Sequence, residues 1–88
     1  MKPKEGIVAS KVGDEYVLVA TGPAEKDFHG IVRLNDTGGF IWNAIAEGLD
    51  EQQIAKRLTE EYQGVDFDGA LKAVRDFVAR LADANFLV

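Results

Sequence analysis

The chain has 88 residues, which is enough for one hydrophobic core and too few for two domains. Its lack of cysteine excludes disulfides, iron–sulfur clusters, thiolate zinc sites and cysteine nucleophiles, and it suits a cytoplasmic protein. A net charge of −5 argues against general binding of DNA or RNA through phosphates, and no apolar run is long enough to span a membrane.

The first third of the chain has the pattern of β-strands. Residues 7–11 and 16–20 are rich in β-branched and aromatic side chains, and Gly13-Asp14 between them suits a two-residue hairpin turn. A loop containing Gly and Pro follows, and residues 28–34 then predict a third strand. Alternation divides this strand into two faces: Phe28, Gly30, Val32 and Leu34 on one, and His29, Ile31 and Arg33 on the other.

After the third strand the apolar residues recur with a helical period. Asn35 or Asp36 can cap a first helix that is apolar nearly all round, so we expect it to be largely buried, and Gly48 is placed to end it. Asp50 can cap a second helix, where Gln53 three residues later completes the pattern of a capping box.

A third and longest helix begins at Asp66 or Asp68 and ends at Asn85. Its apolar residues recur at intervals of three and four: Phe67, Leu71, Val74, Phe77, Val78 and Leu81. The apolar tail 86–88 is expected to pack back onto the domain. A three-stranded sheet with an apolar face needs a cover, so the sequence predicts an α+β fold in which the helices cover the sheet.

No set of residues in the sequence has the pattern of a catalytic or metal site. The only histidine is His29, and the only serine, Ser10, is not part of a nucleophile motif. Thr37-Gly38-Gly39 resembles part of a phosphate loop but lacks its Lys-Ser/Thr, so a tight strand-to-helix junction is the better interpretation. We therefore expect a protein that is not an enzyme and that has no cofactor and no metal.

Two features favour binding to another chain. A three-stranded sheet has two free edges whose backbone groups can pair with an added strand. On the third helix, Lys72 and Arg75 are three residues apart and share a face, and Arg80 adds a third cation. Ile31 points away from the face that carries Leu34, which leaves it available for contact.

Residues 34–42 read Leu-Asn-Asp-Thr-Gly-Gly-Phe-Ile-Trp, which resembles the LN-x-T-G-x-x-IW signature of PqqD-like proteins. Residues 48–62 resemble that family's second-helix pattern, and residues 76–88 resemble its last helix and its ending. Asn85 stands where the family often has glycine. The resemblance extends from residue 28 to residue 88.

The resemblance implies a winged-helix-like fold, with a three-stranded antiparallel sheet followed by three helices, as a single peptide recognition domain over residues 1–88. It implies a non-catalytic protein that captures the leader of a ribosomally made precursor peptide and presents it to a modifying enzyme, such as a radical S-adenosylmethionine maturase. In the name-giving case the product is pyrroloquinoline quinone. The leader is expected to add a strand beside the third strand and to lie against the third helix. Carried over to this sequence, the peptide-binding residues are Ile31, Val32, Arg33, Leu71, Lys72, Arg75 and Val78.

Two other functions are compatible with the sequence. A winged-helix DNA-binding regulator would have a similar arrangement of helices, although here the cations stand among many acidic residues. A structural partner that stabilises an enzyme without touching its substrate is the other alternative. The chain is expected to be a monomer, or a dimer formed by strand exchange.

Overall fold

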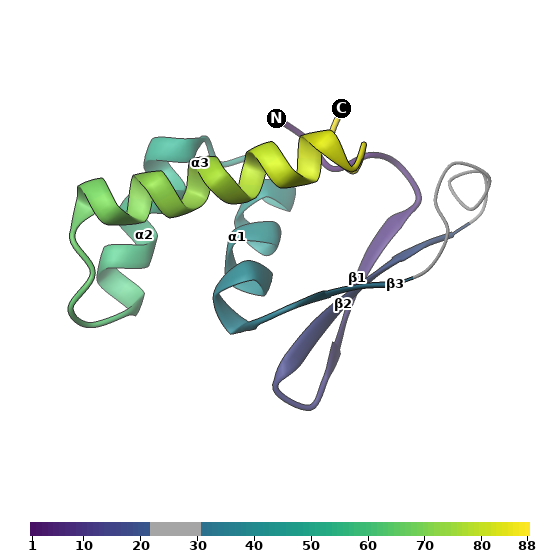
Figure 1. The fold of residues 1–88 in the computed structure, drawn as a ribbon, viewed down its shortest axis with the longest axis horizontal. Coiled ribbons are helices and arrows are strands. Elements are labelled where there is room, and N and C mark those ends of the chain that lie inside the picture. Colours follow the sequence, from purple (N-terminus) through teal and green to yellow (C-terminus); the bar gives the residue numbers. More distant parts are fainter. Residues whose placement is uncertain (22–30) are drawn as a thin grey trace.

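The computed structural model describes residues 1–21 and 31–88 and shows an antiparallel sheet followed by three helices (Figure 1). The sheet contains β1 (Ile7–Val12), β2 (Glu15–Ala20) and β3 (Ile31–Leu34) in the order β1-β2-β3. The α+β fold predicted from the sequence is confirmed. Because β2 lies in the middle, β1 and β3 each have an edge with which no other described strand pairs.

The turn between β1 and β2 follows the prediction. Val12 pairs with Glu15, so the turn consists of Gly13 and Asp14 alone, and Gly13 has the positive φ of 63° that such turns require. The third strand was predicted from residue 28, but residues 28–30, including His29, lie outside the described part of the chain.

Alternation in β3 agrees with the prediction over the residues that the structure describes. Val32 lies opposite Leu18 of β2, Leu34 is buried, and Arg33 between them is exposed. The face that carries Leu18, Val32 and Leu34 therefore contributes to the core. Arg33 is on the opposite face of the sheet.

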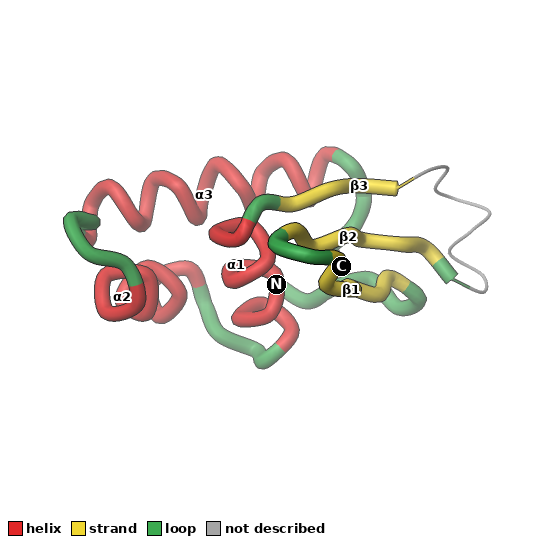
Figure 2. Tube along the Cα trace, turned by 90° about the horizontal axis from the view of Figure 1, so that it is seen from below, coloured by secondary structure: helices red, strands yellow, loops and turns green. Residues whose placement is uncertain are grey.

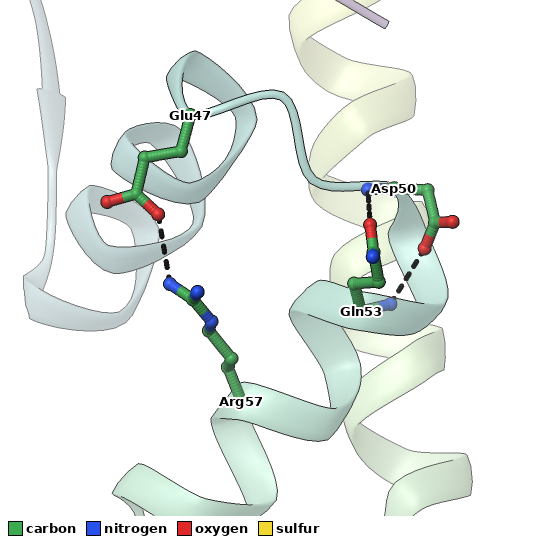
Figure 3. A network of polar contacts seen from close by, with 4 residues as sticks. All are labelled: Glu47, Asp50, Gln53 and Arg57. Atoms are coloured by element: carbon green, nitrogen blue, oxygen red, sulfur yellow. Dashed lines mark hydrogen bonds and ion pairs between the residues drawn. The ribbon is translucent and has the colours of Figure 1, made fainter.

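Each helix begins at a side chain that caps it. Asn35 caps α1 (Asp36–Ala46) by accepting a hydrogen bond from the backbone N–H of Gly38. Asp66 caps α3 (Phe67–Asp83) by accepting one from the backbone N–H of Gly69. Helix α2 (Glu51–Glu61) begins with the predicted capping box, in which Asp50 and Gln53 exchange hydrogen bonds of 2.8 and 2.9 Å (Figure 3).

An ion pair connects the end of α1 to the exposed side of α2. The Arg57 guanidinium lies 2.9 Å from the Glu47 carboxylate, with both side chains about half exposed (Figure 3). Such exposed pairs contribute little to stability, so the contact is better understood as neutralising the charge of Arg57.

The core lies where the helices meet the sheet, and α3 contributes part of its apolar pattern to it. Its buried residues are Ala70, Val74, Phe77 and Leu81. Of the other apolar positions in the pattern, Phe67 is 42% exposed, whereas Leu71 and Val78 are partly buried at the margin of the core. The buried face also includes Ala70, which the apolar pattern did not contain.

The two ends of the chain are hydrogen-bonded to each other. The backbone N–H of Lys4 donates to the carbonyl of Phe86, and that of Val88 donates to the carbonyl of Lys2, each at 2.8 Å. The expected packing of the tail is confirmed, with Phe86 buried, and both ends lie close together in Figure 1. Asn85 makes the reversal possible by adopting a positive φ of 66°.

Candidate functional site

A groove runs between β3 and α3, and its first part lies at the junction of β3 with α1. This hollow of about 200 Å³ is here called the junction pocket. It is lined by residues of the junction, of α1 and of α3: Leu34, Asn35, Thr37, Gly38, Ile41, Ala73, Asp76, Phe77 and Arg80. Figure 2 shows β3 as the strand nearest to α3.

The second part of the groove lies toward the ends of the chain. This tail pocket has a volume of about 180 Å³ and is lined by Val32, Leu34, Phe77, Arg80, Leu81, Ala84 and Phe86. Apart from Arg80 its lining is entirely apolar. The two pockets share Leu34, Phe77 and Arg80, so they form one groove with Arg80 at the place where they meet.

A third hollow continues along α3 beyond the end of β3. This helix pocket has a volume of about 290 Å³ and is lined by Thr37, Leu58, Tyr62, Gln63, Val65, Gly69, Ala70 and Ala73. It shares Thr37 and Ala73 with the junction pocket. Concave surface therefore extends along much of one side of α3.

Tyr62 holds one wall of the helix pocket in place. Its hydroxyl donates a hydrogen bond of 2.7 Å to the Asp36 carboxylate, and its ring packs edge-on against Phe40. Partial burial and this hydrogen bond raise the pKa of the Tyr62 hydroxyl above its usual value. The contact ties the end of α2 to the start of α1.

The charges along the groove differ in whether they already have a partner. The Asp76 carboxylate lies 2.9 Å from the Lys72 ammonium, which raises the pKa of Lys72. Arg80 has no hydrogen bond or ion pair to any residue in the described part of the chain. The groove thus contains one acidic group that is already paired and one guanidinium that is available.

The structure brings some of the predicted peptide-binding residues to the groove and leaves others outside it. Ile31, Val32 and Arg33 form β3, and the side chain of Val32 lines the tail pocket. The helical residues predicted to face the strand are absent from the linings of both groove pockets: Leu71, Lys72, Arg75 and Val78. Leu71 and Val78 pack at the margin of the core, and Arg75 is exposed.

The groove face of α3 contains residues that were not among the predicted peptide contacts, although Arg80 had been noted as a cation of this helix. Ala73, Asp76, Arg80 and Ala84 follow one another at intervals of three and four, so they lie on one side of the helix. The available signal was the pair of small residues, Ala73 and Ala84, because small side chains leave room for a neighbouring chain.

Neither a metal site nor a membrane span is found in the part of the chain that the structure describes. Residues 1–21 and 31–88 contain no group of three or more side chains that could hold a metal ion. No helix among these residues is long and apolar enough to cross a membrane.

Comparison with known proteins gives a consistent result. The chain superimposes on the solved structure of TbiB1 in complex with the TbiA(beta) leader peptide with a TM-score of 0.81, at 28% identity, over 99% of this chain and 94% of that one. It also superimposes on a lasso peptide synthetase B1 complexed with the leader peptide, with a TM-score of 0.77 at 22% identity, over 98% and 93% of the two chains. No match was found among curated proteins. The family model of coenzyme PQQ synthesis protein D (PqqD) matches residues 15–87, and the chain therefore belongs to the PqqD family.

Proposed function

We propose that this protein binds the leader segment of a ribosomally made precursor peptide and presents the peptide to a modifying enzyme. The observation that carries this proposal is the groove beside the free edge of β3. It is supported by the structural similarity to TbiB1, which was solved with a leader peptide bound.

Strand addition is the binding mode that this geometry favours. An extended peptide can pair with the free backbone groups of β3, and main-chain hydrogen bonds then supply affinity that does not depend on sequence. Every second side chain of the peptide would point toward α3 and enter the pockets. Ile31, Val32 and Arg33 supply the strand side of this proposed site.

The helical side of the site is proposed to consist of Asp76, Phe77 and Arg80 in place of the residues expected from the sequence. These three line the junction pocket. Leu71, Lys72, Arg75 and Val78 stay a prediction as peptide contacts, and they would require the peptide to reach around α3.

The proposal gives the chain no catalytic role of its own. The sequence contains no cysteine and one serine, so the chemistry is assigned to the partner enzyme. Family resemblance suggests a radical S-adenosylmethionine maturase in the cytoplasm as this partner, with residues 1–88 acting as one recognition domain.

A DNA-binding regulator is a weaker alternative because two of the cations on the exposed helices are already paired. Arg57 is bound to Glu47, and Lys72 is bound to Asp76. Phosphate binding would have to compete with these carboxylates in a chain whose net charge is −5.

Isothermal titration with the leader of a precursor encoded beside this chain's gene tests the proposal. We expect a Kd of about 1 µM or lower. A series of peptides, each N-methylated at one backbone position, should lose binding at every second position, because only alternate N–H groups of an added strand face β3. Arg33→Pro, which removes an N–H that faces away from β2, should also weaken binding. Uniform tolerance of N-methylation would refute strand addition, and no binding of any leader would refute the function.

A further inference from the structure

We infer that Arg80 sets the specificity of the groove, by selecting peptides in which an acidic residue stands between two apolar ones. This inference rests on the proposed function and assigns a chemical class to the segment that is bound. Its basis is the position of one guanidinium where two pockets meet.

The position of Arg80 allows it to contact a ligand in either groove pocket. It lines both the junction pocket and the tail pocket, and no carboxylate in the described part of the chain binds it. By contrast, the Arg57 guanidinium and the Lys72 ammonium each lie 2.9 Å from a carboxylate of this chain. Arg80 is therefore the cation in the groove lining whose N–H groups are not hydrogen-bonded to a described residue.

The surroundings of Arg80 strengthen its attraction for a carboxylate. The acidic residue in the groove lining is Asp76, and it is already paired with Lys72. An occupied groove would also exclude water from the guanidinium, because the tail pocket is apolar on every other side. A carboxylate can then accept two parallel hydrogen bonds from the planar guanidinium, which gives this contact its specificity.

The arrangement of the two pockets predicts a spacing in the peptide. In a strand added to β3, side chains that face α3 come from every second residue. The residue that meets Arg80 lies between the residue entering the junction pocket and the one entering the tail pocket. The expected pattern is apolar, any residue, acidic, any residue, apolar.

A comparison of two exposed cations provides the test. Lys56 of α2 is exposed, lines neither groove pocket and has no proposed contact with the peptide. Arg80→Glu and Lys56→Glu change the net charge equally. They differ in whether the altered charge lies in the groove.

The experiment is selection of a phage-displayed library of random peptides against the full chain. Peptides selected by the wild type and by Lys56→Glu should share the acidic residue between two apolar ones. Arg80→Gln should lose the acidic preference, and Arg80→Glu should replace it with Lys or Arg. A synthetic copy of a selected peptide should bind the wild type about tenfold more weakly after Glu→Gln in the peptide, and this loss should vanish with Arg80→Gln.

Two results would contradict the inference, and they are distinct. Enrichment of peptides without an acidic preference, or of the same acidic peptides by Arg80→Glu, would show that the groove binds peptides without this role for Arg80. Failure to enrich any peptide on any of the folded variants would refute peptide binding itself, and the inference with it. Circular dichroism confirms folding of each variant before selection.

Discussion

The ring of Tyr16 occupies the space that a side chain on Gly39 would need. A Cβ built on Gly39 would overlap with Cδ2 of Tyr16. The backbone of α1 therefore packs directly against a side chain of β2. This contact explains the second glycine of the Thr-Gly-Gly sequence: it fixes how the sheet is placed against α1, and thereby the direction in which β3 enters the groove.

The close contact between Tyr16 and Gly39 predicts that a single methyl group added at Gly39 lowers the stability of the fold. Gly39→Ala should destabilise the fold by about 2 kcal/mol, because the ring or the helix must move. In a Tyr16→Ala background the same change should be neutral or stabilising, since alanine favours a helix over glycine by about 1 kcal/mol. Urea unfolding followed by fluorescence of the single, buried Trp42 measures both values. An equal cost in the two backgrounds would show that the ring is not the cause.

The capping box at the start of α2 predicts a measurable loss of stability when its acceptor, the Asp50 carboxylate, is removed. Asp50→Ala should lower the free energy of unfolding by about 1 kcal/mol, because the N–H of Gln53 loses its side-chain acceptor. Gln52→Ala, at an exposed position in the same turn, is the control and should change stability by less than about 0.5 kcal/mol. Equal effects of the two changes on urea midpoints would argue against the box.

The hydrogen bond from Tyr62 to Asp36 predicts a dependence on pH. The pKa of Tyr62 is raised in the folded chain, so the folded state holds this proton more tightly than the unfolded state does. The contribution is therefore complete below the usual tyrosine pKa of about 10 and is lost as pH rises through the raised value. Tyr62→Phe keeps the ring against Phe40 and should cost about 0.5 kcal/mol at neutral pH.

The difference in stability between wild type and Tyr62→Phe should shrink above about pH 10. Tyr16→Phe serves as the control, since the Tyr16 hydroxyl makes no hydrogen bond within the described part of the chain. A difference that stays constant into the alkaline range would mean that the hydroxyl contributes in some other way than through its proton.

The packing of the tail predicts that Phe86, the third residue from the end of the sequence, matters to the stability of the whole fold. Phe86 is only 7% exposed, and Phe86→Ala should destabilise the chain by about 3 kcal/mol. Val88 is 84% exposed, so Val88→Ala should be close to neutral. Thermal unfolding of the two variants gives the comparison, and similar melting temperatures would show that the tail does not belong to the core.

Local features were predictable from the sequence because they depend on neighbouring residues. The caps at Asn35, Asp50 and Asp66 and the turn at Gly13 each involve residues no more than three positions apart. The left-handed conformation of Asn85 is likewise a local property. Such features are fixed by side-chain chemistry before any tertiary contact forms.

The helical wall of the groove was not predictable in the same way. Which side of α3 faces β3 depends on how the helix is rotated, and that rotation is a tertiary property: it places Ala70 and Val74 in the buried core. Alanine carries little weight in a hydrophobic pattern, so Ala70, Ala73 and Ala84 were overlooked in favour of Leu71. The bridge between Pro3 and Leu87 also escaped prediction, since it joins opposite ends of the chain.

The pairing of the chain ends bears on the entropy of the unfolded protein. Because the backbone of Lys2 already bonds to that of Val88, a short linker could join the ends without displacing either. A closed ring has far fewer unfolded conformations, and for a loop of this length the gain in stability is about 4.6 kcal/mol. The exposed turn at Gly13 and Asp14 is then a natural place to open new ends, in a circular permutant that leaves the groove beside β3 intact.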